Sequence, residues 1–322
     1  MHIGFVIILS IFLLFSGSLV FIWSWYLRNE SEISNKIYNT AMKAYQNSKY
    51  STAESLFLRA ISVYYHNFKA HYQLGLTNLK LYKYDKAKSC FEKVIKNDAN
   101  NVDAKFWLAY TMQQLKDFSE AEILYSAVLK ISPAYCDCFF QLGLIEFEKE
   151  KYEDAIQFFE KAKALSYDKI LCTFYITKCK DKLCKYDTKE EGKSIIEEYL
   201  KLINESVLPE GFYLALATAY AKCGNAKDAL TYCQKSIESD SENYESYKLL
   251  GLIQLLYKDF EGVKNTLATA ISLQSDNIEL HDILSYALCQ QDNMCAVKKC
   301  REKYSEIIKR FIKPKTNQSN NV

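Results

Sequence analysis

Proline and glycine are scarce in this chain of 322 residues, which contains only three prolines and nine glycines. Both residues interrupt regular helices, and clusters of them mark turns, flexible linkers and the ends of strands. Their scarcity therefore argues against an all-β fold and against long disordered linkers between domains. Lysine, glutamate, leucine and alanine are abundant instead, and these residues favour the α-helix. We predict an all-α protein.

The chain also lacks a strong net charge and the short motifs of common enzymes. Its formal charge is +2, so no overall positive field suggests a nucleic-acid partner. The four histidines, which are His2, His66, His71 and His281, have no partner at the spacing of a nucleophile or a metal ligand. Glycine-rich phosphate loops, HExxH and GxSxG are absent. We expect no catalytic residue and no cofactor.

Eleven cysteines are too dilute in a chain of this length for a disulfide-stapled domain, and their odd number leaves at least one unpaired. Free thiols favour a reducing compartment. The nearest candidates for a metal site are Cys136 with Cys138, the group Cys172, Cys179 and Cys184, and the group Cys289, Cys295 and Cys300. None forms the paired CxxC knuckles of a structural zinc site. We interpret them as packed thiols, and a metal-binding regulatory protein that uses the carboxy-terminal cysteines remains the alternative.

A long uncharged segment stands at the amino terminus. Residues 3–26 contain no charged side chain, and as a helix they would reach about 36 Å, enough to span a bilayer core. Trp23, Trp25 and Tyr26 cluster at the far end, where aromatic rings favour the headgroup level. The segment is predicted to be a transmembrane anchor.

A cleaved secretory signal is the competing interpretation of this segment, and it would make the chain a secreted or periplasmic assembly protein. The segment lacks the basic start of a signal peptide, and its apolar run continues past the weak cleavage site at residues 16–18. Arg28, Lys36 and Lys43 follow the segment, whereas only His2 precedes it. The positive-inside rule then predicts a single-pass membrane protein with its remaining residues on the cytoplasmic side.

A repeat of 34 residues organises the rest of the chain. A tyrosine, an alanine three residues later and a phenylalanine four residues after that occur at Tyr50, Ala53 and Phe57, at Tyr84, Ala87 and Phe91, and at Tyr152, Ala155 and Phe159. This period is typical of a solenoid of helical hairpins. Units are predicted to start at Ser34, Phe68, Val102, Cys136, Ile170, Glu210, Tyr244 and Ile278, with a longer fifth unit. They fill residues 34–311, and residues 312–322 are predicted to be a disordered tail.

The repeat resembles the tetratricopeptide repeat family. The resemblance rests on first-helix pairs such as Leu74-Gly75, Leu108-Ala109 and Leu142-Gly143, and on the second-helix alanines Ala53, Ala87, Ala121, Ala155 and Ala229. The large residues Phe57, Phe91, Tyr125 and Phe159 follow in phase. This resemblance implies a right-handed superhelical solenoid of roughly eight helix hairpins. It also implies which face of each first helix lines the inner, concave side.

A ladder of aromatic residues falls on that inner face. Tyr38, Tyr72, Phe106, Phe140 and Phe174 recur every 34 residues, and Tyr110, Leu144 and Phe147 continue the same face. One interpretation is that these rings only pack against each other between adjacent first helices. The other is that they line a groove that receives an apolar segment of another polypeptide, since aromatic anchors are frequent binding hot spots. The sequence thus predicts a membrane-anchored, non-catalytic scaffold with a protein or peptide partner.

Overall fold

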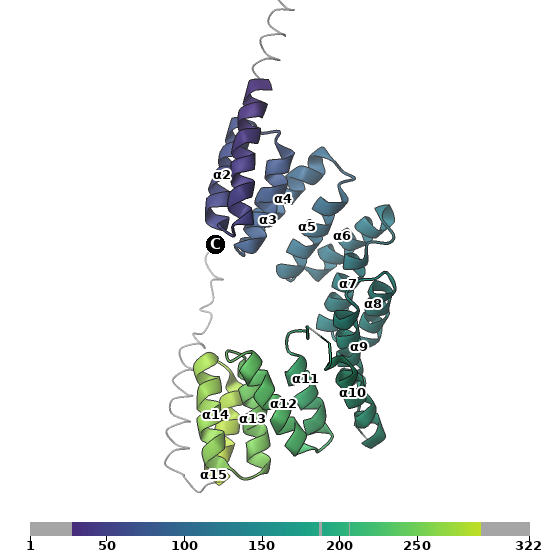
Figure 1. Ribbon diagram of the computed structural model, residues 1–322, viewed down its shortest axis with the longest axis vertical. Coiled ribbons are helices and arrows are strands. Elements are labelled where there is room, and N and C mark those ends of the chain that lie inside the picture. Colours follow the sequence, from purple (N-terminus) through teal and green to yellow (C-terminus); the bar gives the residue numbers. More distant parts are fainter. Residues whose placement is uncertain (1–27, 187–188, 206, 291–322) are drawn as a thin grey trace, which may run out of the picture. The chain divides into compact units, whose positions relative to one another are not determined.

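The computed structural model describes residues 28–186, 189–205 and 207–290, and within these ranges it contains helices and turns but no β-strand (Figure 1). No helix in these ranges is long and apolar enough to cross a membrane. The predicted anchor at residues 3–26 and the predicted tail at residues 312–322 lie outside the described residues. The chain forms two compact units, one ending at residue 151 with the addition of 164–167, and one formed by 152–163 and the residues from 168 onward.

The first unit contains a helix over residues 28–46 followed by six helices of 13 or 14 residues. These are α2 (Tyr50–Val63), α3 (Phe68–Lys80), α4 (Tyr84–Asn97), α5 (Val102–Gln114), α6 (Phe118–Ile131) and α7 (Cys136–Glu148). Within this unit α3 packs on α4 and α5 packs on α6 as hairpins, and α3, α5 and α7 also contact one another in succession. First helices therefore stack side by side along one face of the unit.

The second unit repeats this plan. Its helices are α8 (Tyr152–Ala164), α9 (Lys169–Leu183), α10 (Lys189–Leu202), α11 (Phe212–Lys222), α12 (Ala226–Ser239), α13 (Tyr244–Leu256), α14 (Phe260–Leu273) and α15 (Ile278–Gln290). The pairs α9–α10, α11–α12 and α13–α14 are hairpins. The predicted longer fifth unit is the α9–α10 hairpin, and the connection after it contains Gly211 with φ of 73°.

Most predicted starts of the repeats agree closely with the helices, but the helix of the first repeat begins at residue 28, six residues before its predicted start at Ser34. First helices begin at Phe68, Val102, Cys136, Tyr244 and Ile278, as the 34-residue period predicts. Those of the fifth and sixth units begin within two residues of their predicted starts, at Lys169 and Phe212. Asparagine caps several of them; the Asn67 side chain, for example, accepts a hydrogen bond from the Ala70 amide.

The core of each hairpin is built from the small and large residues that define the repeat. The second-helix alanines Ala53, Ala87, Ala121, Ala155 and Ala229 are fully buried, and so are Phe57, Phe91, Tyr125 and Phe159. The contact between the two helices is close, because a Cβ added to Gly75 would lie 2.7 Å from two ring carbons of Phe91. The sequence pattern is therefore a packing pattern: small residues let two helices approach, and one large ring fills the space beside them.

The turn inside each hairpin is also periodic. Ser48, Tyr82, Lys116 and Glu150 all have φ between 57° and 64°, and each lies two residues before a second helix. This left-handed residue ends the first helix and reverses the chain direction, as in the common helix C-terminal motifs. At the same place in two later hairpins, Gly224 has φ of 74° and Lys258 has φ of 58°. The turns thus keep the same register as the buried residues.

Candidate functional site

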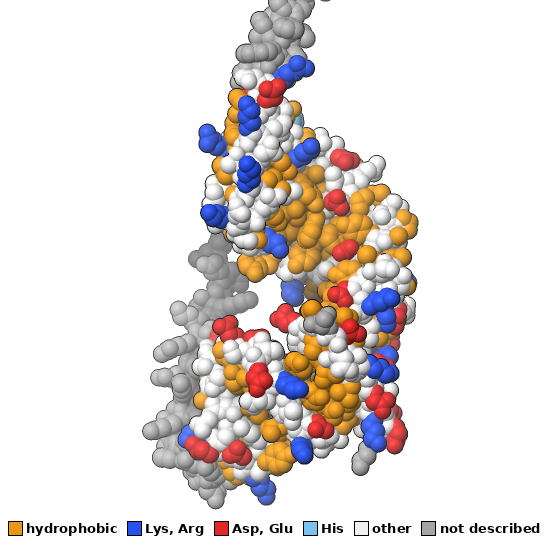
Figure 2. All heavy atoms as spheres, in the orientation of Figure 1, with side chains coloured by type: hydrophobic (Ala, Val, Ile, Leu, Met, Phe, Trp, Pro, Cys, Tyr) orange, Lys and Arg blue, Asp and Glu red, His pale blue; other side chains and the backbone are white. Residues whose placement is uncertain are grey.

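A groove of about 640 Å³ lies on the first helices of the first unit. Aromatic residues from the helix over residues 28–46, from the start of α4, from α5 and from the turns between helices dominate its lining. They are Tyr45, Tyr82, Tyr84, Phe106, Trp107, Tyr110 and Tyr135. Figure 2 shows hydrophobic side chains gathered over α3 and α5. We refer to this hollow as the aromatic groove.

The 34-residue period explains why these side chains meet. Leu76 on α3 and Tyr110 on α5 occupy the same place in successive 34-residue repeats, and both line the aromatic groove. Tyr110 packs edge-on against Trp107 at 5.6 Å between ring centroids, and Trp107 packs in the same way against Phe106 at 5.2 Å. Because the first helices lie side by side, one face of each contributes to a continuous apolar surface.

The structure corrects part of the predicted ladder. Phe106, Phe140 and Phe174 are 5%, 4% and 1% exposed, so their rings belong to the core rather than to an open wall. Residues that precede the next first helix cover two of them. Tyr135 lies 5.2 Å from Phe106, and Tyr167 stacks on Phe140 at 4.6 Å, each between ring centroids.

Phe174 is buried in the second unit, where its ring lies 6.2 Å from that of Tyr199 and 6.1 Å from that of Phe212. The interpretation that the aromatic rings pack on one another therefore holds for these three phenylalanines. Of these three, only Phe106 is among the residues that line the aromatic groove.

The other predicted residues are half-buried. Tyr38 packs against Phe57 at 5.7 Å between ring centroids, and Tyr72 packs against Phe91 at 5.9 Å, each within its own hairpin. Both border a smaller hollow of about 310 Å³ that also contains Asp98 and Asp103. Leu144 and Phe147 on α7 are also half-buried. Tyr110 is thus the predicted residue that the structure places most fully in the aromatic groove.

Sequence reasoning missed Trp107, Tyr82 and Tyr135 as groove residues. Trp107 follows a ladder position directly, and the pattern assigned that place to no particular face. Tyr82 lies in a turn and is 79% exposed, and Tyr135 precedes α7. The signal that could have found them is the local density of aromatic residues between Tyr82 and Tyr135, since the turns bring this stretch to one side of the unit.

The chemistry of the aromatic groove is apolar with neutral polar groups. Burial raises the pKa of Tyr110 above its ordinary value, so the phenol stays protonated and can donate a hydrogen bond. Two amide side chains, Gln114 and Gln141, line the same surface, and single charges of opposite sign stand at Lys80 and Asp137. This lining can hold apolar side chains and bond to a peptide backbone, and it offers no nucleophile with an activating base.

Three of the cysteines considered as metal candidates are core residues, whereas Cys136 and Cys184 are partly exposed. Cys138, Cys172 and Cys179 are fully buried, and burial raises the pKa of Cys138 to about 12. No group of three or more histidine, cysteine, aspartate or glutamate side chains could hold a metal ion within the described ranges. The carboxy-terminal group of Cys289, Cys295 and Cys300 is not settled by this, because Cys295 and Cys300 lie outside those ranges.

Within the second unit the ladder position changes from apolar to charged, from Phe174 on α9 and Leu214 on α11 to Lys248 on α13. Lys248 takes the place of an aromatic ring on α13, and its ammonium lies 2.8 Å from Glu245 and 3.1 Å from Glu279. The pair with Glu245 lies within α13, and the pair with Glu279 links α13 to α15. The apolar ladder therefore ends within the second unit, between Leu214 and Lys248.

Comparisons with known proteins agree with the fold. Tetratricopeptide repeat models match residues 78–137, residues 137–169 and residues 211–243. The chain therefore contains tetratricopeptide repeats in both units. No curated protein matches the chain. Proteins with this repeat generally serve as protein-binding scaffolds, the repeat fold is typically non-catalytic, and the comparisons show no catalytic family.

Solved structures show the same helical solenoid at low identity. A tetratricopeptide repeat protein from Parabacteroides merdae is 16% identical with a TM-score of 0.64, over 79% of this chain and 98% of that one. The Cut9–Hcn1 hetero-tetramer of the APC/C matches at 15% identity and a TM-score of 0.62, over 80% of this chain and 47% of that one. PilF of Pseudomonas aeruginosa matches at 18% identity and a TM-score of 0.54, over 68% of this chain and 97% of that one.

Proposed function

We propose that this chain is a membrane-anchored, non-catalytic scaffold that binds an apolar segment of another polypeptide in the aromatic groove. The observation that carries the proposal is the groove itself, with its volume of about 640 Å³ and its lining of aromatic rings from several elements. Binding pockets for compact ligands have volumes of this order. Aromatic anchors bury a large area at a small cost in side-chain entropy.

A polypeptide fits this groove better than a charged ligand does. The lining combines rings with the amides of Gln114 and Gln141 and with protonated tyrosine hydroxyls. Such groups can bond to both the N–H and the C=O of a peptide backbone while the rings receive apolar side chains. Lys80 and Asp137 provide no net charge for a phosphate or a nucleic acid. The assembly of Cut9 with Hcn1 gives an example of a similar fold in a hetero-oligomer.

The membrane anchor rests on the sequence of residues 3–26, which is uncharged and long enough for one span. Arg28, Lys36 and Lys43 favour a cytoplasmic position for the repeats. The alternatives are a secreted or periplasmic assembly protein after signal cleavage and a metal-binding protein that uses the carboxy-terminal cysteines. Mass spectrometry of the native chain separates these three cases. A chain that retains Met1 and carries no metal supports the membrane anchor. Loss of about eighteen residues supports signal cleavage, and bound zinc supports the metal-binding protein.

Site-specific photo-crosslinking tests the groove. With p-benzoylphenylalanine at position 110 of the full chain, we expect one discrete adduct with another polypeptide in membranes. The adduct should form through a segment rich in apolar residues, identified by mass spectrometry of the crosslinked peptide. The matched control carries the photo-reactive residue at Ile123, which is 62% exposed on α6, outside the aromatic groove.

The control position should give no adduct of that mass. If positions 110 and 123 yield the same adducts in similar amounts, the groove has no selective partner and the proposal fails.

A further inference from the structure

A patch of exposed apolar side chains lies on the first helices α13 and α15 of the second unit. Leu252 and Leu256 are one turn apart on α13, and Tyr286 on α15 occupies the same place in the eighth repeat as Leu252 in the seventh. Leu256 and Tyr286 are 74% and 56% exposed. In the first unit Leu76 and Tyr110 hold this place, and both line the aromatic groove. We refer to Leu252, Leu256 and Tyr286 as the α13–α15 patch.

Within the second unit no described helix covers the α13–α15 patch, since its side chains remain exposed. α14 packs on another side of α13 and α15, where its residues Leu267 and Ala270 are fully buried. α13 and α15 also contact each other directly, so their exposed side chains form one surface. A terminal repeat needs a polar surface to stay in solution, and an open apolar surface there indicates an occupant.

The sequence that follows α15 contains an apolar stripe with helical spacing. Val297, Cys300, Tyr304, Ile307 and Phe311 recur at intervals of three and four residues, which places them on one face of a helix. These residues lie outside the described ranges. Between the first and the last of them the chain has six lysines and arginines and two glutamates, so this segment has a net charge of +4.

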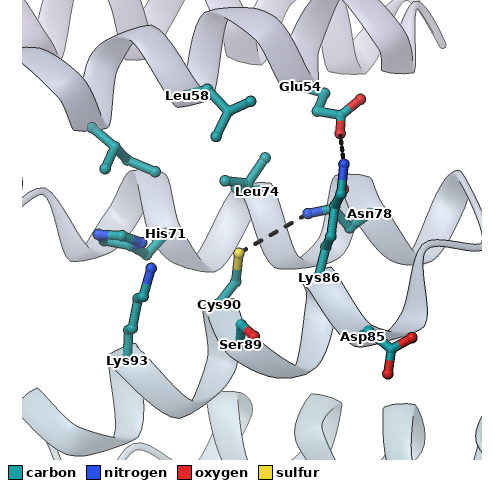
Figure 3. Close-up of a pocket in the computed structure, with 11 residues that line it drawn as sticks. Glu54, Leu58, His71, Leu74, Asn78, Asp85, Lys86, Ser89, Cys90 and Lys93 are labelled. Carbon is teal, nitrogen blue, oxygen red and sulfur yellow. Dashed lines mark hydrogen bonds and ion pairs between the residues drawn. The ribbon is translucent and has the colours of Figure 1, made fainter.

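The α3–α4 hairpin shows what the second helix of a repeat must supply. Cys90 on α4 faces α3, where Asn78 Nδ2 points to its sulfur at 4.0 Å (Figure 3). The next residue, Phe91, is fully buried and packs on Gly75 of α3. Three residues further along α4, Val94 is buried as well. A second helix thus needs a large apolar side chain followed, three residues later, by a compact one.

The eighth repeat does not supply this pair. Cys300 stands at the place of Cys90, but Arg301 replaces the buried ring and Tyr304 replaces the compact residue. A buried guanidinium without a partner is costly, and a tyrosine side chain is too large for a space that holds alanine or valine in other repeats. Residues 297–311 are therefore poorly suited to pack on α15 as α4 packs on α3.

The described part of the chain ends beside the α13–α15 patch. Gln290 is the last residue of α15 and lies one turn after Tyr286. Residues 291–296 follow it, and an extended connection of this length reaches about 20 Å, which is enough to reverse the chain direction. As a helix, residues 297–311 would be about 22 Å long, close to the length of about 20 Å for α15. The segment can therefore run back along α15 and over the patch.

The charges of the two surfaces are complementary. α15 contains two acidic residues, Glu279 and Asp282, and no lysine or arginine, whereas α13 contains one charge of each sign. Asp282 is exposed, lies one turn before Tyr286 on the same face, and makes no ion pair with any described residue. The two helices together have a net charge of −2, opposite in sign to that of residues 297–311.

We propose that residues 297–311 of this chain dock as an amphipathic helix on the α13–α15 patch. The apolar stripe lies on the patch, and lysine and arginine side chains of the segment lie beside Asp282. The contact covers the first-helix surface of the second unit, so a partner segment has only the aromatic groove of the first unit available. The docking site does not include the aromatic groove, and either proposal can fail without the other.

Photo-crosslinking from position 286 identifies the occupant. With p-benzoylphenylalanine in place of Tyr286 in the full chain, we expect an adduct within one chain to residues 297–311, found by mass spectrometry of the digested monomer. The matched control carries the photo-reactive residue at Leu230, which is 39% exposed on α12, and should give no adduct with this segment. An adduct between two copies of the chain, an adduct with another polypeptide, or no adduct with residues 297–311 would overturn the proposal.

Limited proteolysis of the full chain measures the same contact without a crosslink. Trypsin cleaves a docked helix only when the helix opens, so Leu256→Asp combined with Tyr286→Asp should speed cleavage within residues 297–311 by at least about tenfold. Both side chains are exposed, so thermal unfolding should change little. Asp282→Lys should also speed this cleavage, whereas Leu230→Asp should leave it unchanged. Equal cleavage rates in the wild type and the double variant would show that the segment packs elsewhere.

Discussion

Phe106→Ala is expected to lower the free energy of unfolding of the first unit by about 3–5 kcal/mol. The Phe106 ring is 5% exposed and contacts the rings of Trp107, Tyr125 and Tyr135, so its removal opens a cavity that three rigid neighbours cannot fill. For a unit of this size the unfolding midpoint should fall by roughly 10 °C. Thermal unfolding followed by circular dichroism measures this shift.

Tyr110→Ala is the matched control for that loss. Tyr110 lies one turn further along the same helix and is half-buried, so the same truncation should lower the midpoint by less than about a third as much. A much larger fall in the unfolding midpoint for Phe106→Ala than for Tyr110→Ala would show that Phe106 belongs to the core and Tyr110 to the groove. Equal, small shifts would instead place Phe106 on the open surface, where the repeat pattern alone had put it.

The second large effect concerns binding. Tyr45→Ala combined with Tyr110→Ala is expected to weaken the affinity for a partner segment by about a hundredfold, because each ring offers a large apolar contact in the groove. Both rings are half-buried, so the fold should survive the double substitution. The affinity is measured by titrating the crosslinked segment, made as a synthetic peptide, into the full chain.

The matched control for this prediction is Tyr65→Ala. Tyr65 is 55% exposed, precedes α3 and lies outside the aromatic groove, so its loss should leave the peptide affinity unchanged. A loss of affinity similar to that of the double variant would mean that the effect comes from general apolar surface rather than from the groove.

Much of the fold follows from the sequence because the same contacts recur. The spacing of Ala87 and Phe91 fixes where a second helix touches its first helix, and both residues are fully buried. The starts at Phe68 and Val102 follow from the same period. These features are local, and a hairpin needs no information about distant parts of the chain to form them.

The site was only partly predictable because it depends on residues outside the repeat pattern. The sequence placed Phe106 and Phe140 on the inner wall, and it could not show that Tyr135 and Tyr167 cover them from the turns. The burial of a ladder residue depends on how the next repeat packs against it, and the 34-residue period does not encode this packing.

The most direct test of the central claim is the accessibility of Trp107, which lines the aromatic groove. The chain has two other tryptophans, Trp23 and Trp25, and replacing both by phenylalanine makes Trp107 the single reporter. Acrylamide should quench its fluorescence in the free chain, and saturation with the partner segment should remove most of that quenching. If quenching is the same with and without the bound segment, the partner binds elsewhere and the aromatic groove is not the binding site.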